Sequence, residues 1–161
     1  LPRVAASEAE LAKDFDAFAR LADAPMAMTA HISYDAFDAN VPATLSKIMI
    51  QDVIRARIGF DGLLMTDDLG MQALGGSLGE RGEAAIAAGC DVLLHCSGFL
   101  SDPLAIHSEM AEVAAVSPEL TGRPLERALR AEALSTHQEE FDLVEGWQTF
   151  QSYFPHLAGA A

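Results

Sequence analysis

The sequence has few basic residues and no long apolar run, and each shortage excludes a class of protein. It holds 10 Lys and Arg against 24 Asp and Glu, a formal net charge of −14. That charge repels the phosphates of nucleic acids and the anionic surface of membranes, so we expect neither as a partner. No apolar run approaches the roughly 20 residues that cross a bilayer, and the first ten residues lack the basic and apolar parts of a secretory signal. A soluble protein is expected.

Cysteine is also scarce. The two cysteines, Cys90 and Cys96, fall in one expected strand, where a separation of six residues places them roughly 20 Å apart, too far for a disulfide. A reducing compartment fits this pair. Neither a CxxC nor an HExxH motif occurs, and the five histidines show no ligand spacing. We therefore expect no metal and no cofactor.

What is present is the composition of one ordinary domain, with 50% hydrophobic and 21% charged residues. Two capping boxes, Ser7 with Glu10 and Ser77 with Glu80, mark helix starts, and Gly89 marks a helix end. Short continuous apolar runs mark strands. The sequence predicts helices over 8–22, from Ser46 to just before Gly59, over 77–89, over 101–116 and from Pro124, and strands over 26–30, 63–66 and 90–95.

These strands and helices alternate. Because the strands are continuous rather than alternating apolar runs, both faces of their sheet should be covered, which is typical of a parallel α/β fold. The strand-to-strand repeat of about 30 to 37 residues is close to one-eighth of a (β/α)₈ barrel. Three βα units do not close a barrel and leave unpaired edges. We expect residues 1–134 to be the C-terminal part of such a barrel. Residues 135–161, whose aromatic residues show no clean period, are expected to form a C-terminal extension.

Polar residues lie at the C-terminal end of each expected strand, where a (β/α)₈ barrel places its reactive groups. They are Thr29 to His31, Thr66 to Asp68, and His95 to Ser97. A carboxylate directly after a buried strand is costly unless it is hydrogen-bonded or used in chemistry, so the two aspartates are candidate functional residues. The alternative is that they only cap the following loop.

Residues 53–70, VIRARIGFDGLLMTDDLG, resemble the signature around the nucleophile of glycoside hydrolase family 3. MTAHISYDAFDANVPATLS resembles the sixth strand and loop of the bacterial β-N-acetylhexosaminidases in that family, and ERGEAAIAAGCDVLLHC resembles their last helix and eighth strand. The resemblance covers about residues 1–130. It implies a (β/α)₈ barrel in which Asp67, directly after the signature threonine, is the catalytic nucleophile.

The same resemblance implies roles for three neighbours. Asp68 is expected to hold the loop or orient Asp67, since this subgroup takes its acid/base from a histidine on a loop that would precede Leu1. His31 matches the family's AHV-type position and is expected to face the pocket and hydrogen-bond Asp67 or the sugar. Met71 is a candidate for the floor under the sugar.

The implied activity is retaining hydrolysis of terminal non-reducing β-N-acetylglucosamine. The family's usual substrates are N-acetylglucosaminyl anhydromuropeptides, which implies peptidoglycan recycling in the cytoplasm. Because the acid/base loop is missing, the chain is expected to be an incomplete fragment that is inactive by itself. Two alternatives remain: another family-3 glycosidase such as a β-glucosidase, and a non-catalytic fragment or interaction module.

Overall fold

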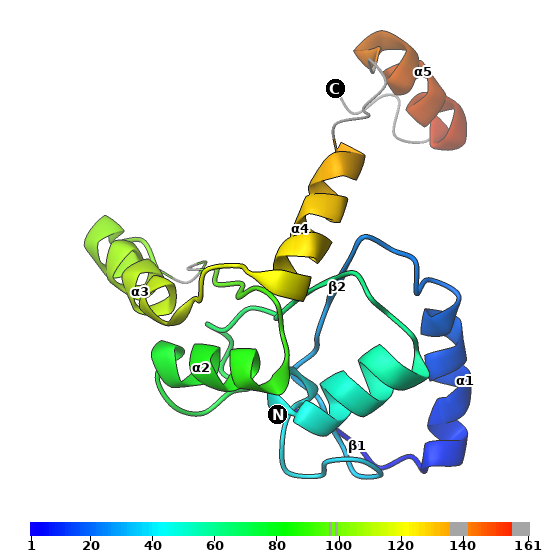
Figure 1. Cartoon of the computed structure of the whole chain (residues 1–161). Coiled ribbons are helices and arrows are strands. Elements are labelled where there is room, and N and C mark those ends of the chain that lie inside the picture. The colour runs from blue at the N-terminus through cyan, green and yellow to red at the C-terminus, as the bar shows by residue number, and fades with distance from the viewer. Residues whose placement is uncertain (97, 99, 136–141, 156–161) are drawn as a thin grey trace. The chain divides into compact units, whose positions relative to one another are not determined.

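The computed structural model of the chain describes residues 1–96, 98, 100–135 and 142–155. Contacts divide it into two units, Leu1–Ala131 and Glu132–Ala161. Its strands are β1 (Arg3–Val4), β2 (Met26–Met28), β3 (Ser33–Tyr34) and β4 (Leu63–Met65). Its helices (Figure 1) are α1 (Glu8–Ala19), the 3₁₀-helix η1 (Ala43–Leu45), the π-helix η2 (Met49–Arg57), α2 (Leu78–Ala88), α3 (Pro103–Val116), α4 (Gly122–Ser135) and α5 (Leu143–Tyr153).

The strands pair in parallel, which confirms the α/β class. β2 lies beside β4, with Met28 opposite Met65, and the two-residue strands β1 and β3 form a second parallel pair. The sequence did not predict β1 and β3, because a pair of residues is too short to carry a periodic pattern. Since β2 and β4 run in the same direction, their carboxyl ends lie at one edge of the first unit.

Local capping fixes the helix boundaries. In both predicted capping boxes the serine hydroxyl accepts from the glutamate amide and the glutamate side chain accepts from the serine amide. These hydrogen bonds lower the pKa of Glu10 and of Glu80 below the usual value. α2 ends at Gly89 in the left-handed region with φ of 119°, as predicted. α1 ends earlier than predicted, at Ala19, and the chain continues as turns.

The helix predicted from Ser46 is present, but most of it is a π-helix. The Ser46 hydroxyl accepts from the Met49 amide at 3.2 Å, so it caps the first turn as expected. Met49, Ile50 and Val53 form the buried stripe. The amide of Ile58 donates to the carbonyl of Val53, five residues earlier. The apolar stripe therefore predicted the element and its buried face, but not its hydrogen-bond pattern.

The strand predicted over 90–95 is wrong as a strand, because only one bridge, from Val92 to Met65, joins it to β4. Beyond that bridge, the Leu94 carbonyl still accepts from the Leu69 amide at 2.9 Å, but two amides of the segment donate to side chains instead of to backbone. The Leu94 amide donates to Oγ1 of Thr66 at 2.8 Å, and the Cys96 amide donates to Oδ1 of Asp68 at 2.9 Å. The segment still runs beside β4, so three chain segments reach the same edge.

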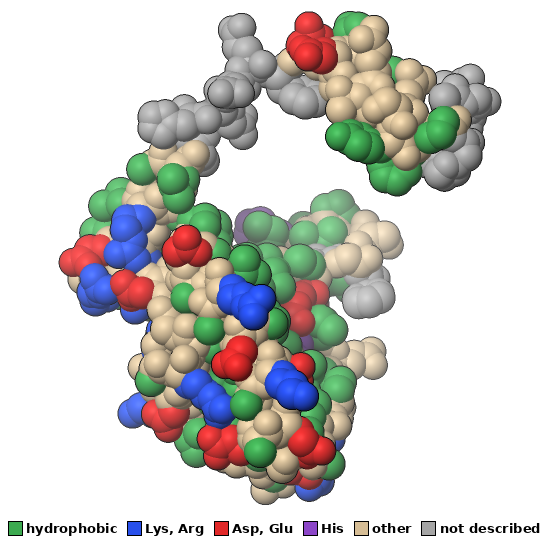
Figure 2. All heavy atoms as spheres, turned by 90° about the vertical axis from the view of Figure 1, so that its right-hand side faces the viewer, with side chains coloured by type: hydrophobic (Ala, Val, Ile, Leu, Met, Phe, Trp, Pro, Cys, Tyr) green, Lys and Arg blue, Asp and Glu red, His purple; other side chains and the backbone are tan. Residues whose placement is uncertain are grey.

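The core lies between β4 and the helices on its two sides. Ile50 of η2, Leu64 of β4 and Ala85 of α2 are fully buried in one apolar cluster. α1 and η2 lie side by side and share a second cluster that includes Leu11 and Val53 (Figure 1). On the face drawn in Figure 2, acidic and basic side chains lie beside one another over the first unit.

A buried network of charged side chains lies beside β4, away from the edge that carries the two aspartates. Asp91, whose side chain is 3% exposed, accepts from Arg55 at 2.8 Å, from Arg127 at 2.9 Å and from the Leu64 amide at 2.8 Å. Arg127 also hydrogen-bonds Asp61, which holds the pKa of that carboxyl at about 2. Burial raises the pKa of the neighbouring Cys90 thiol to about 12. Both cysteines are free, as expected.

The second unit contains α5, which the sequence did not predict. The Asp142 side chain caps it by accepting from the amides of Val144 and Glu145. Trp147 stacks on Phe150 with 5.3 Å between ring centroids, and Phe150 lies 5.0 Å from Phe154. These aromatic residues recur at helical spacing, so the absence of a clean period expected from the sequence is wrong. The rest of the expected extension, 136–141 and 156–161, lies outside the described residues.

Candidate active site

The site predicted at the strand ends comes together at the carboxyl end of β2 and β4. The Thr29 amide donates to the Met65 carbonyl at 2.9 Å, and the Thr66 amide donates to the Val92 carbonyl at 3.1 Å. These bonds continue the parallel alignment one residue past each strand. They bring Thr29 to His31 against Asp67 and Asp68.

Asp67 is half-buried, and its backbone is tied to the neighbouring strand end. Its amide donates to Oγ1 of Thr29 at 3.3 Å, and its Oδ1 accepts from the amide of Asp68 at 2.8 Å. Within the residues that the structure describes, Oδ2 accepts no hydrogen bond. One carboxylate oxygen is therefore held against its own backbone, and the other is available to a ligand.

Asp68 points its side chain into the loop. Its Oδ1 accepts from the amides of Gly70 at 2.8 Å and Cys96 at 2.9 Å. A side chain on Gly70 would lie 3.1 Å from that oxygen, so the turn is tight. The carboxylate thus connects the end of β4 to the segment that follows Val92.

His31 is buried, and both ring nitrogens contact groups other than the Asp67 carboxylate. Nδ1 lies 2.8 Å from Oγ1 of Thr44, and Nε2 lies 2.8 Å from the Asp68 carbonyl oxygen. The sequence suggested a hydrogen bond from His31 to the Asp67 side chain, but Thr44 and the Asp68 carbonyl take its place. The reason is geometric: the ring reaches past Asp67 to the backbone of the next residue.

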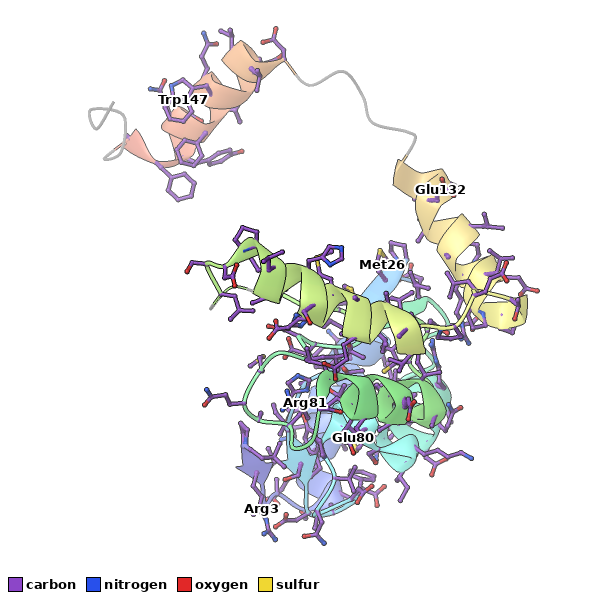
Figure 3. The ribbon with its side chains drawn as sticks, turned by 90° about the vertical axis from the view of Figure 1, so that its left-hand side faces the viewer. Arg3, Met26, Glu80, Arg81, Glu132 and Trp147 are labelled. Atoms are coloured by element: carbon purple, nitrogen blue, oxygen red, sulfur yellow. The ribbon has the colours of Figure 1, made fainter. Side chains whose placement is uncertain are left out.

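Met71 lies in the turn after the two aspartates, and its side chain is 39% exposed. Its amide donates to the Asp68 carbonyl at 3.1 Å. Arg81, near the start of α2 (Figure 3), holds this turn, with Nη1 donating to the carbonyls of Leu69 at 2.6 Å and Met71 at 3.4 Å. Arg81 was not predicted, because only the folded turn brings these carbonyls to it.

Two other residues near the aspartates were missed or set aside from the sequence. The side chain of His95 is 5% exposed, with Nε2 at 2.9 Å from Glu109 on α3 and Nδ1 at 3.6 Å from Oδ1 of Asp68. Thr44, in the 3₁₀-helix η1, is fully buried and hydrogen-bonds His31. A threonine in so short an element carries no local signal of such a contact.

The chemistry available at this edge is that of carboxylates, hydroxyls and imidazoles. Over residues 1–96, 98, 100–135 and 142–155, no three His, Cys, Asp or Glu residues gather as a metal site would require. In the same residues, no helix is long and apolar enough to cross a bilayer. An apolar cavity of about 390 Å³ lies between α1, β2 and η2 rather than at Asp67.

Comparisons with known proteins found glycosidases similar to this chain in sequence and in fold. The profile of the glycosyl hydrolase family 3 N terminal domain matches residues 1–129. The beta-hexosaminidase of Chromobacterium violaceum is 48% identical over 88 residues, which cover 52% of this chain and 24% of the relative. The chain thus spans about a quarter of that relative's length.

Two solved structures from Thermotoga are similar as well. CbsA from Thermotoga neapolitana has 34% identity and a TM-score of 0.61 over 88% of this chain and 34% of that one. The beta-N-acetylglucosaminidase from Thermotoga maritima has 30% identity and a TM-score of 0.58 over 88% of this chain and 32% of that one.

Proposed function

This chain belongs to glycosyl hydrolase family 3, and from that membership we propose that Asp67 is the nucleophile of a retaining β-N-acetylhexosaminidase. Curated relatives that match about half of the chain are named beta-hexosaminidases, which favours N-acetylhexosamine over glucose as the sugar. The observation that carries the proposal is the placement of Asp67. It is a half-buried carboxylate directly after β4, with its amide tied to Thr29 and one oxygen without a partner in the described residues.

We also propose that residues 1–134 form the last three βα units of a (β/α)₈ barrel. β2, β4 and the segment 90–95 would be its sixth, seventh and eighth strands, and residues 135–161 a C-terminal extension. The parallel register of β2 and β4 and the helices packed on β4 support this assignment. In such a barrel the carboxyl ends of the strands form the active site, and Asp67 lies there.

The proposed reaction has two displacements. Oδ2 of Asp67 attacks the anomeric carbon, the bond to the leaving oxygen breaks, and a general acid protonates that oxygen. Water then attacks the same carbon, a general base takes its proton, and the glycosyl ester breaks to return the carboxylate. The family resemblance assigns acid and base to one histidine outside these residues, so complete catalysis needs a chain that also carries that loop.

The neighbours of Asp67 take supporting roles in this proposal. Asp68 holds the loop through Oδ1, which already accepts from two amides, and so is poorly placed to act as the acid. His31 acts on the backbone of Asp68 rather than on the sugar. The exposed side chain of Met71 would form part of the floor under the sugar.

The proposed substrate is a terminal non-reducing β-N-acetylglucosamine, and the proposed setting is the recycling of N-acetylglucosaminyl anhydromuropeptides in the cytoplasm. Resemblance to the bacterial subgroup supports this assignment. Comparing hydrolysis of chromogenic β-N-acetylglucosaminide and β-glucoside by the full-length enzyme tests it. A higher kcat/KM for the glucoside would favour the β-glucosidase alternative.

The nucleophile assignment predicts that Asp67→Asn lowers kcat by several orders of magnitude, because an amide cannot form the ester intermediate. A 5-fluoro analogue of N-acetylglucosamine should trap that ester in the wild-type enzyme. Peptide mass spectrometry should place the label on Asp67 and find none in the variant. A label on Asp68 would reverse the two roles, and an active, unlabelled Asp67→Asn variant would remove Asp67 from the chemistry.

A further inference from the structure

We infer that Thr44, together with Thr29 and His31, forms a hydrogen-bonded relay that fixes the backbone on both sides of the nucleophile, which makes Thr44 a positioning residue. This inference rests on the proposed role of Asp67. The relay begins at the Asp67 amide, passes through Oγ1 of Thr29 and Oγ1 of Thr44 to His31, and ends at the Asp68 carbonyl.

Only one direction of donation satisfies every group in this relay. A carbonyl oxygen can only accept, so Nε2 of His31 carries the proton at the Asp68 end. In the neutral ring Nδ1 is then an acceptor, which requires the Thr44 hydroxyl to donate to it at 2.8 Å. The Thr44 oxygen accepts in turn from the Thr29 hydroxyl at 2.9 Å. Each hydroxyl donates once and accepts once.

The hydrogen bonds of the relay are buried, so their loss cannot easily be compensated by water. Thr44 is 0% exposed, His31 3% and Thr29 5%, so water has little access to replace a missing partner. A buried polar group that loses its partner keeps its desolvation cost, and hydrogen bonds in a chain strengthen one another. Loss of one hydroxyl should therefore disturb the whole relay rather than one contact.

The two ends of the relay determine where the Asp67 carboxylate points. One end holds the amide of Asp67 and the other holds the carbonyl of Asp68, so the backbone around the nucleophile is restrained on both sides. Oδ1 of Asp67 is bonded to the amide between these ends. A rotation of that peptide would therefore move the carboxylate itself. Displacements near 1 Å are enough to lower a chemical step strongly.

The test compares Thr44→Val, which keeps the shape and removes the hydroxyl, with Thr44→Ser, which keeps the hydroxyl, in the full-length enzyme. We expect valine to lower kcat and the rate of trapping by the 5-fluoro analogue by about tenfold to a hundredfold, with KM within about threefold. Serine should recover most of that loss. Ser46→Ala is the matched control, because it removes a buried hydroxyl that bonds Asp38 and the Met49 amide outside the relay. It should lower Tm while kcat stays near the wild-type value.

Full kcat in Thr44→Val would overturn the inference. It would also be overturned if Thr44→Val and Ser46→Ala lost kcat in proportion to their loss of Tm. If Thr44→Val does not fold, Thr29→Val breaks the relay at the other hydroxyl and Thr29→Ser restores it. Independently of activity, ring ¹⁵N shifts should show His31 neutral with the proton on Nε2, and a proton on Nδ1 would reject the relay. Wild-type enzyme that is active but never labelled at Asp67 would instead remove the proposed nucleophile.

Discussion

At the residue scale, Asp68 shows how a second carboxylate can follow the proposed nucleophile without acting as an acid. Its Oδ1 accepts from two backbone amides, those of Gly70 and Cys96, which lie on different chain segments. His95 lies 3.6 Å from the same oxygen. The carboxylate therefore joins the end of β4 to the segment beside it. Holding this loop requires an oxygen at that position, but no exchangeable proton.

If Asp68 holds the loop, Asp68→Ala should lower both stability and kcat more than Asp68→Asn does. Alanine leaves both amides without their acceptor, which costs about 1–3 kcal/mol, whereas asparagine can place its carbonyl oxygen where Oδ1 lies. Thermal unfolding should show a larger loss of Tm for alanine, and kcat should fall in the same order. Equal losses of kcat in both variants, with Tm unchanged, would mean that Asp68 acts on the substrate.

Residue by residue, the sequence predicted the groups that follow strands but not the groups that support them. Asp67 and Asp68 could be singled out because two acids after an apolar run are unusual, and the family signature assigned the first of them a role. Thr44 could not, because its partners Thr29 and His31 lie 15 and 13 residues away and no local pattern links them. His31 was noticed for its position, but its hydrogen bonds were not predictable.

At the element scale, Asp91 connects η2, β4 and α4. Its two oxygens accept from Arg55, Arg127 and the Leu64 amide, and the arginine side chains are 12% and 14% exposed. Removing the carboxylate takes the ion-pair partner from the buried Arg55 and leaves the buried Arg127 paired only with the half-exposed Asp61. Breaking a buried pair in this way is much more costly than losing one on the surface.

We therefore expect Asp91→Ala to lower the free energy of unfolding by about 3–5 kcal/mol, as measured by urea denaturation. Asp61→Ala is the matched control on the same arginine. Its side chain is 47% exposed, so its ion pairs are screened and its loss should cost less than about 1 kcal/mol. The pKa of Asp61 is lowered from 3.8 to about 2. Its small contribution to the free energy of unfolding is therefore fully present above pH 3.8 and is lost as the pH falls through about 2. Equal costs for both variants would contradict the buried network.

Elements with local signals were predicted well. The capping boxes and Gly89 placed the start of α1 and both ends of α2, and the helix predicted over 101–116 is present as α3, which begins at Pro103. The segment 90–95 does not form the predicted strand, because the amides of Leu94 and Cys96 donate to side chains of Thr66 and Asp68, which no apolar pattern encodes. α5 was missed because its aromatic residues were read as a cluster rather than by their helical spacing.

At the scale of the whole molecule, the first unit exposes large apolar side chains to solvent. Met26 and Met28 on β2 are 45% and 50% exposed, and Phe18 and Leu21 at the end of α1 are 62% and 63% exposed. The side chains border the apolar cavity between α1, β2 and η2. The sequence led us to expect uncovered sheet edges, since three βα units cannot close a barrel.

The parallel register of β2 and β4 sets the order of events when the chain refolds. Each pair in that register joins residues 37 positions apart, so the loop between them must close first, whereas α2 needs only contacts between neighbouring residues. Helices form in about a microsecond, and parallel pairing is far slower. In pulsed hydrogen exchange, amides inside α2 should gain protection before the amide of Thr29, which pairs with the Met65 carbonyl. Simultaneous protection would contradict this order. In the expected order, the proposed nucleophile Asp67 reaches its geometry only late in folding, since the Thr29 hydroxyl that accepts from its amide arrives with β2.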